Sequence, residues 1–150
     1  MSRSETYQVG VLRGEELLKW WPDISGCLRS VPPESLWLRG VGPDGILQLA
    51  IKGEVQVWAA GTTDSFQLFV ISRLIDFEDK KVLKIEYAYG QNLPDLLPQL
   101  VDVTDACAEM FECESIVLVG RRGWERVLKE HGYEINGVIL TKGIKKRRIN

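Results

Sequence analysis

Residues 82–133 decide the fold, and they read VLKIEYAYG (82–90), NLPDLLPQLVDVTDACAEMFECE (92–114), SIVLVG (115–120) and RRGWERVLKEHGY (121–133). An apolar strand enters a turn at Gly90, and a long amphipathic helix follows it. A second strand, which is fully apolar, comes next and leads into a second helix. Because a strand–helix–strand crossover usually joins two neighbouring parallel strands, this stretch predicts a parallel strand pair covered by helices.

Antiparallel sheet is predicted before this stretch, because short polar turns separate successive apolar segments. These segments are 46–60, Phe66 to Phe77 and Val82 to Tyr89. The first of them contains Gly53, which indicates either a bulge in one long strand or a tight hairpin between Ile46–Ala50 and Glu54–Ala60.

The N-terminal third predicts one short strand followed by helices. Tyr7 to Leu12 alternates as a strand does, and Glu15 lies in the first turn of a helix. Pro22 lacks an N–H group and is expected to interrupt this helix, so a second helical piece is predicted from Asp23 to Val31. Ser35 to Arg39 is either an arm or a further strand.

These elements predict an α+β protein with a mixed, mostly antiparallel central sheet of about six or seven strands flanked by helices. The predicted order is β-α-α-β-β-β-α-β-α-β, with Val138 to Thr141 as the closing strand. A chain of 150 residues is expected to form one domain, spanning 1–150, with a basic tail from about residue 142.

Composition favours a globular protein, since 45% of the residues are hydrophobic and 27% are charged. A place in the cytoplasm is expected from two further observations. No apolar run is long enough to span a bilayer, and the N-terminus lacks the profile of a signal peptide. Three cysteines without a CxxC pair, and one histidine, predict reduced thiols and no metal site.

Charge is unevenly distributed, because residues 121–150 carry nine Lys/Arg against three Glu while residues 1–120 carry an acidic excess. The basic tail from Lys142 onward either attracts a phosphate or an acidic protein surface, or is a solvated chain end. No aromatic residues are interleaved with the basic residues, so the pattern does not favour nucleic-acid binding.

Two adjacent tryptophans, Trp20 and Trp21, cannot share one face of a helix. One of them is therefore predicted to be exposed or to contact another protein, which includes a second copy of this chain. The alternative is simple packing of both rings beside Pro22.

The order of elements resembles the GNAT fold of the acetyl-CoA-dependent N-acyltransferases. The match in sequence is confined to about residues 82–141, where a helix, Gly132-Tyr133 and a strand are similar to the closing segment of that family. The phrase GRRGW at 120–124, followed by Leu128, resembles small GNAT-like proteins encoded by bacteriophages, which implies a place in the host cytoplasm or in a virion.

The resemblance implies an acetyl-CoA site at the end of the fourth strand and a general base on the fourth or fifth strand. Glu86 is the candidate for this base, with pairing to Lys84 or to a neighbouring strand as the structural alternative. The backbone that would hold the cofactor belongs to Ala88, Tyr89, Gly90, Gln91, Asn92 and Leu93. In the family, such a loop and the helix start after it bind a pyrophosphate.

Several residues depart from the family pattern. The loop has one glycine and no Arg or Lys, while Pro94 and Pro98 remove two N–H donors. Leu128 stands where the family often has a tyrosine that acts as general acid, and Leu128 cannot donate a proton.

Two hypotheses of function follow. The first is a GNAT-like protein whose acetyl-CoA site is degraded and which serves as a non-catalytic binding or assembly module, in a phage particle or against a host protein. The second is an acetyl-CoA-dependent N-acetyltransferase that acts on an unknown amine. The missing tyrosine, the altered loop and the tryptophans favour the first.

Overall fold

A computed structural model describes residues 8–29, 36–61, 66–90, 93–118 and 122–135, together with residues 137, 140, 142 and 144. The chain divides into two compact units, Met1–Val119 and Gly120–Asn150. The first unit contains the whole described sheet.

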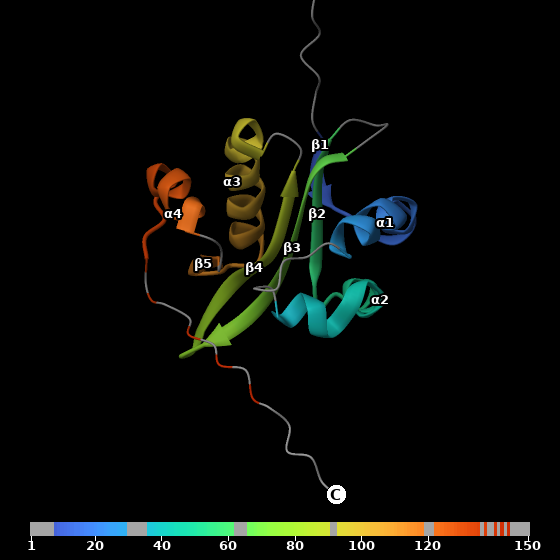
Figure 1. The fold of residues 1–150 in the computed structure, drawn as a ribbon, viewed down its shortest axis with the longest axis horizontal. Coiled ribbons are helices and arrows are strands. Elements are labelled where there is room, and N and C mark those ends of the chain that lie inside the picture. Colours follow the sequence, from blue (N-terminus) through green and yellow to red (C-terminus); the bar gives the residue numbers. More distant parts are fainter. Residues whose placement is uncertain are drawn as a thin grey trace, which may run out of the picture. The chain divides into compact units, whose positions relative to one another are not determined.

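The sheet of the first unit has five strands in the order β1-β2-β3-β4-β5 (Figure 1). The strands are β1 (Gln8–Val11), β2 (Gln56–Gly61), β3 (Phe66–Phe77), β4 (Lys80–Gly90) and β5 (Ser115–Leu118). All neighbours pair antiparallel except β4 and β5, which pair parallel. The crossover predicted from residues 82–118 is therefore confirmed, since α3 (Leu93–Met110) connects the two parallel strands.

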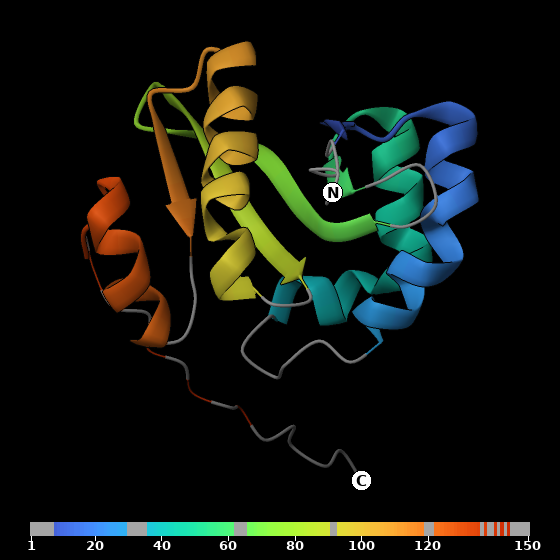
Figure 2. The same ribbon diagram turned by 90° about the horizontal axis from the view of Figure 1, so that it is seen from above.

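Helices cover both faces of the sheet, with α1 (Gly14–Leu28) and α2 (Leu36–Lys52) on one face and α3 on the other (Figure 2). The core under α1 and α2 joins the buried stripe of α1 to inward-facing side chains of β2 and β3. Its members include Leu17, Trp21, Ile24, Leu28, Ile46, Val57, Phe69 and Ile71. Their spacing of four, three and four along α1 is that of one helical face.

The core under α3 is formed by one face of that helix. Buried there are Leu97, Leu100, Val101, Thr104, Cys107 and Ala108. The Thr104 hydroxyl bonds back to the carbonyls of Leu100 and Val101 at 3.0 Å, which lets a polar side chain be buried without losing a hydrogen bond.

The α+β class and the presence of a mixed, mostly antiparallel sheet are confirmed, but the predicted count of six or seven strands is wrong for the described residues. Ile46–Ala50 belongs to α2 and is not a strand. Leu36 to Arg39 is helical too, so an arm or strand there is excluded. Of the predicted closing strand at 138–141, only Leu140 is described, and it has no regular structure.

Gly42 explains how α2 accommodates Pro43. Gly42 has φ 77° and ψ 163°, a backbone conformation that glycine adopts without a Cβ clash, and it divides the helix into two segments. Pro43 then opens the second segment, where its fixed φ suits a helix start and its missing N–H costs nothing. Gly53 is neither a bulge nor a hairpin turn, because it ends α2 with φ 81° and its N–H donates to the Ala50 carbonyl.

The predicted interruption at Pro22 is also wrong, since α1 runs from Gly14 to Leu28 with Pro22 inside it. Leu18, whose carbonyl loses its helical partner at Pro22, is 56% exposed, and Pro22 itself is exposed. Water can therefore replace the lost hydrogen bond, and the apolar face of α1 packs without a break.

The second unit contains α4 (Arg122–Leu128) and a 3₁₀ turn, Lys129–His131. Gly132 follows with φ 90° and its N–H donates to the Lys129 carbonyl, so a left-handed glycine ends this turn.

Candidate functional site

A β-bulge in β4 creates the candidate site. Ile71 of β3 pairs with Tyr87, whereas the next residue, Ser72, pairs with Ile85. Glu86 is therefore the extra residue of β4, without a direct partner across β3. A bulge of this kind bends a strand and redirects its side chains, and such bulges occur frequently beside active sites.

The bulge changes which residues of β4 face α1 and α2. Lys84 pairs with Arg73, and both lie on the same face of the sheet. Simple alternation from Lys84 would send Tyr87 to the opposite face. The extra residue shifts the alternation, so that Tyr87 and Tyr89 pack against the core under α1 and α2.

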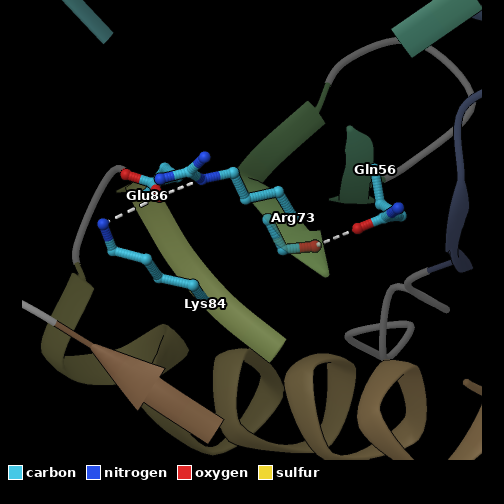
Figure 3. Close-up of polar contacts among 5 residues, drawn as sticks. Gln56, Arg73, Lys84 and Glu86 are labelled. Atoms are coloured by element: carbon cyan, nitrogen blue, oxygen red, sulfur yellow. Dashed lines mark hydrogen bonds and ion pairs between the residues drawn. The ribbon is translucent and has the colours of Figure 1, made fainter. Parts of the chain in front are cut away.

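Glu86 is held by two cations on this face (Figure 3). Arg73 Nε donates to Glu86 Oε1 at 2.7 Å, and Lys84 Nζ lies 3.1 Å from the same oxygen. The Glu86 side chain is only 6% exposed, whereas those of Arg73 and Lys84 are 29% and 23% exposed. The expected pairing with Lys84 is thus present, and Glu86 as a general base stays a prediction.

Beyond the bulge, β4 has a free edge. Its parallel pairing with β5 covers only Val82 to Ile85, although β4 continues to Gly90. Among the described residues, no strand pairs with 86–90 on the side of β5, whereas β3 pairs with Tyr87 to Gly90 on the other side. Backbone N–H and C=O groups at such an edge can pair with an extended ligand.

The residues predicted to hold the cofactor are divided between a strand and a helix. Ala88, Tyr89 and Gly90 are the last residues of β4, and Leu93 is the first residue of α3. Gln91 and Asn92 lie outside the described residues. The free strand edge therefore points towards a helix start, where N–H groups and the helix dipole favour an anion.

Pro94 lies in the first turn of α3 and Pro98 lies inside the helix. Pro94 removes one of the N–H groups that a helix start offers to an anion. The helix is nevertheless continuous from Leu93 to Met110, so its dipole begins beside the end of β4.

An aromatic cluster beside Glu86 was not recognised from the sequence. The Phe69 ring centroid lies 5.7 Å from that of Tyr87 and 5.5 Å from that of Tyr89. Burial raises the pKa of the Tyr87 hydroxyl, and Cys27 and Tyr89 add to the effect. Only the strand register reveals this cluster. Without the bulge, simple alternation from Lys84 would place Tyr87 and Tyr89 on the opposite face of the sheet.

Cys27 of α1 lies beside the aromatic cluster and packs against the same core. Burial raises the pKa of its thiol and nearby Asp23 adds to this, whereas a hydrogen bond with Tyr89 opposes it. The thiol is therefore protonated at neutral pH and is not an activated nucleophile.

The two tryptophans of α1 differ in burial. Trp21 is 7% exposed and belongs to the core, while Trp20 is half-buried at its edge with Lys19 Nζ 5.1 Å from the ring centroid. Any contact of this pair with another protein is thus restricted to Trp20, and such a contact stays a prediction.

In the second unit, a buried residue stands at the position where the resembled family often has a tyrosine that acts as general acid. Leu128 is 4% exposed, and His131 lies exposed at the end of the 3₁₀ turn. Among the described residues, no group of three or more His, Cys, Asp or Glu could hold a metal ion. No described helix is both long and apolar enough to cross a membrane.

Comparison with known proteins gives a result for structure alone, because no family model and no curated protein matches the sequence. A GCN5-related N-acetyltransferase from Ralstonia eutropha aligns with a TM-score of 0.69 at 13% identity, covering 93% of this chain and 99% of that one. Glucosamine-6-phosphate N-acetyltransferase from Arabidopsis thaliana aligns with a TM-score of 0.66 at 11% identity, covering 94% and 100%.

A predicted acetyltransferase from Clostridium acetobutylicum, solved with acetyl-CoA, aligns with a TM-score of 0.66 at 13% identity and covers 92% of this chain and 95% of that one. These likenesses extend over nearly the whole of each chain, at identities that establish the fold and nothing finer. This chain therefore has the fold of the GCN5-related N-acetyltransferases.

Proposed function

We propose that this chain binds acetyl-CoA along the free edge of β4 and transfers the acetyl group to an amine. The observation that carries the proposal is the stretch from Glu86 to Gly90, which no described strand pairs on the side of β5 and which leads from the bulge to the start of α3. The amide groups of the cofactor's pantetheine arm would pair with this edge, as an added strand does. The pyrophosphate would lie at the helix start.

In the proposed reaction, the amine nitrogen attacks the thioester carbonyl, forms the new C–N bond, and releases coenzyme A when the C–S bond breaks. Glu86 would accept the proton of the amine through a water molecule. The departing sulfur would take its proton from solvent, because Leu128 cannot supply one. The pair of cations on Oε1 would fix the carboxylate in place.

Isothermal titration with acetyl-CoA, followed by a thiol-release assay over a panel of amines, tests the proposal. We expect a dissociation constant of about micromolar order, and release of coenzyme A that depends on the amine. Glu86→Gln should retain acetyl-CoA binding and lose most of the transfer. Absence of binding at millimolar acetyl-CoA would refute the proposal.

A second candidate function is a non-catalytic binding or assembly module, in a virion or directed at a host protein. The observation that favours it is the double pairing of Glu86, which leaves no described carboxylate on this part of β4 without a cation. Trp20 is then the residue proposed to reach the partner protein or a second copy of the chain. Acetyl-CoA binding without transfer to any amine would favour this candidate over the enzyme.

Light scattering after size exclusion tests the partner surface. If Trp20 contacts a second copy, Trp20→Ala should convert an oligomer into a monomer while the stability changes little. Glu16→Ala, an exposed residue of the same helix outside the core, provides a control. A monomeric parent chain would exclude self-association through Trp20.

A further inference from the structure

A hollow lies at the β1 edge of the sheet, away from the free edge of β4. It has a volume of about 560 Å³, and its described lining residues belong to the first unit and come from three places. The end of β1 and the start of α1 form one wall, the end of α2 and the start of β2 form another, and Phe111 after α3 closes the third side. This volume is in the range of small-molecule sites.

The walls of this hollow are mainly apolar, and part of the apolar surface is open to solvent. Leu18 is 56% exposed and Ile51 is 66% exposed, and both line the hollow together with Leu17 and Phe111. Large apolar side chains that gather at one concave place usually mark a binding site, whereas scattered ones carry no such meaning.

The charged residues that line the hollow indicate which kind of apolar ligand it would favour. Among the described residues, the lining contains two that are charged, Arg13 before α1 and Lys52 at the end of α2, and both are cations. Neither forms an ion pair with a described residue among the pairs found. Gln56 also lines the hollow, but its amide is neutral. Its Oε1 already accepts a hydrogen bond from the buried Ser72 hydroxyl at 3.2 Å.

We propose that this hollow binds a medium-chain fatty acid, with the alkyl chain against Leu17, Leu18, Ile51 and Phe111 and the carboxylate towards Arg13 and Lys52. The concave shape favours a small ligand over a flat protein surface, and the two cations favour an acid over a neutral lipid. The site is separate from the proposed acetyl-CoA site and does not depend on it.

Titration of the full chain with octanoate, decanoate and dodecanoate below their micelle concentrations tests the proposal. We expect saturable binding of one molecule per chain that tightens by about tenfold for each two added carbons. Decyltrimethylammonium, which has the same chain and the opposite charge, should bind at least about tenfold more weakly than decanoate.

Matched pairs of variants test whether the ligand binds in the hollow. Ile51→Gln should weaken decanoate binding, whereas Met110→Gln should not, because Met110 is 60% exposed but does not line the hollow. Arg13→Gln combined with Lys52→Gln should abolish the preference for the acid, whereas Lys80→Gln should preserve it. Lys80 lies 4.0 Å from Glu114 and outside the hollow.

Three outcomes would overturn the proposal. The first is an affinity that does not change with chain length or with Ile51→Gln. The second is equal binding of decanoate and decyltrimethylammonium. The third is self-association that Ile51→Gln abolishes, since a second copy would then cover the hollow.

Discussion

At the scale of single residues, the turn between β3 and β4 carries backbone strain. Glu78 and Asp79 connect the paired residues Phe77 and Lys80, and their φ values are 50° and 66°. Positive φ at both central residues is the pattern of a type I′ hairpin turn, for which Asn-Gly is the preferred sequence. Glutamate and aspartate with their Cβ atoms reach this conformation only at a cost in free energy.

Replacement of this turn by Asn-Gly should therefore stabilise the protein. We expect the double variant Glu78→Asn, Asp79→Gly to raise the free energy of unfolding by about 1 kcal/mol, measured by urea denaturation. Lys80→Asn, next to the turn, is the control and should not reproduce the gain. A loss of stability in the double variant would show that the turn does not have this conformation.

Among the described residues, Cys107 is a thiol whose pKa burial raises strongly. Burial raises the pKa of its thiol to about 12, against an ordinary value of 9.0; nearby Cys113 adds to this, and a hydrogen bond with Ser72 opposes it. A group with a raised pKa stabilises the fold below its unfolded pKa, and this contribution is lost as pH rises through the folded pKa. The affected range is pH 9 to about 12.

Within that range, the free energy of unfolding should fall with pH, and Cys107 should account for up to about 1.4 kcal/mol per pH unit of the slope. Cys107→Ala lowers stability at every pH because it leaves a cavity, but it should flatten this part of the curve. Cys27 and Tyr87 add smaller slopes of the same sign, since burial raises their pKa values as well. An unchanged slope in Cys107→Ala would contradict the assignment.

At the scale of elements, helices and strands whose apolar residues repeat with one clear period could be predicted from the sequence. Segments whose apolar pattern fits both a helix and a strand could not. The inner face of α3, the strands β3 and β4 and the parallel crossover follow from their apolar patterns. The run ILQLA at 46–50 fits a short strand as well as a helix, because five apolar-rich residues are too few to distinguish the periods. Its helical state follows from the packing of Ile46 under the sheet, which sequence pattern does not contain.

At the same scale, Pro22 does not interrupt its helix as proline rules predict. The predicted order of elements agrees with the structure up to the last strand, but two predicted helices on either side of Pro22 are one helix, and the second helix of the structure lies at Leu36–Lys52. Pro22 is tolerated because it lies on the exposed face of α1, so the cost of the missing hydrogen bond is small compared with the burial of Leu17, Trp21 and Ile24.

Continuity of α1 through Pro22 can be measured. Pro22→Ala restores a helical hydrogen bond and should raise the free energy of unfolding by about 2 kcal/mol if residues 14–28 form one helix. If Pro22 instead opened a second helix, the same substitution would be neutral or slightly destabilising. Chemical denaturation of Pro22→Ala beside Pro32→Ala, which lies outside the described helices, separates the two outcomes.

At the scale of the whole molecule, the candidate site depends on a register that no local pattern reveals. Glu86 could be selected from the sequence, but its pairing with Arg73 depends on the bulge, and the pairing of Tyr87 and Tyr89 with Phe69 depends on it too. The free edge of β4 exists because β5 pairs with four residues and β4 is 11 residues long. Strand lengths and register are products of tertiary packing, so this part of the site could not be predicted.

The central claim is that acetyl-CoA occupies the free edge of β4, and amide hydrogen exchange tests it directly. With saturating acetyl-CoA, exchange in a peptide covering residues 86–90 should slow by at least about tenfold, because edge amides acquire hydrogen-bond partners. The β3–β4 turn at Glu78 and Asp79 serves as the internal reference and should exchange at the same rate with and without ligand. Unchanged exchange at residues 86–90 under millimolar acetyl-CoA would contradict the account.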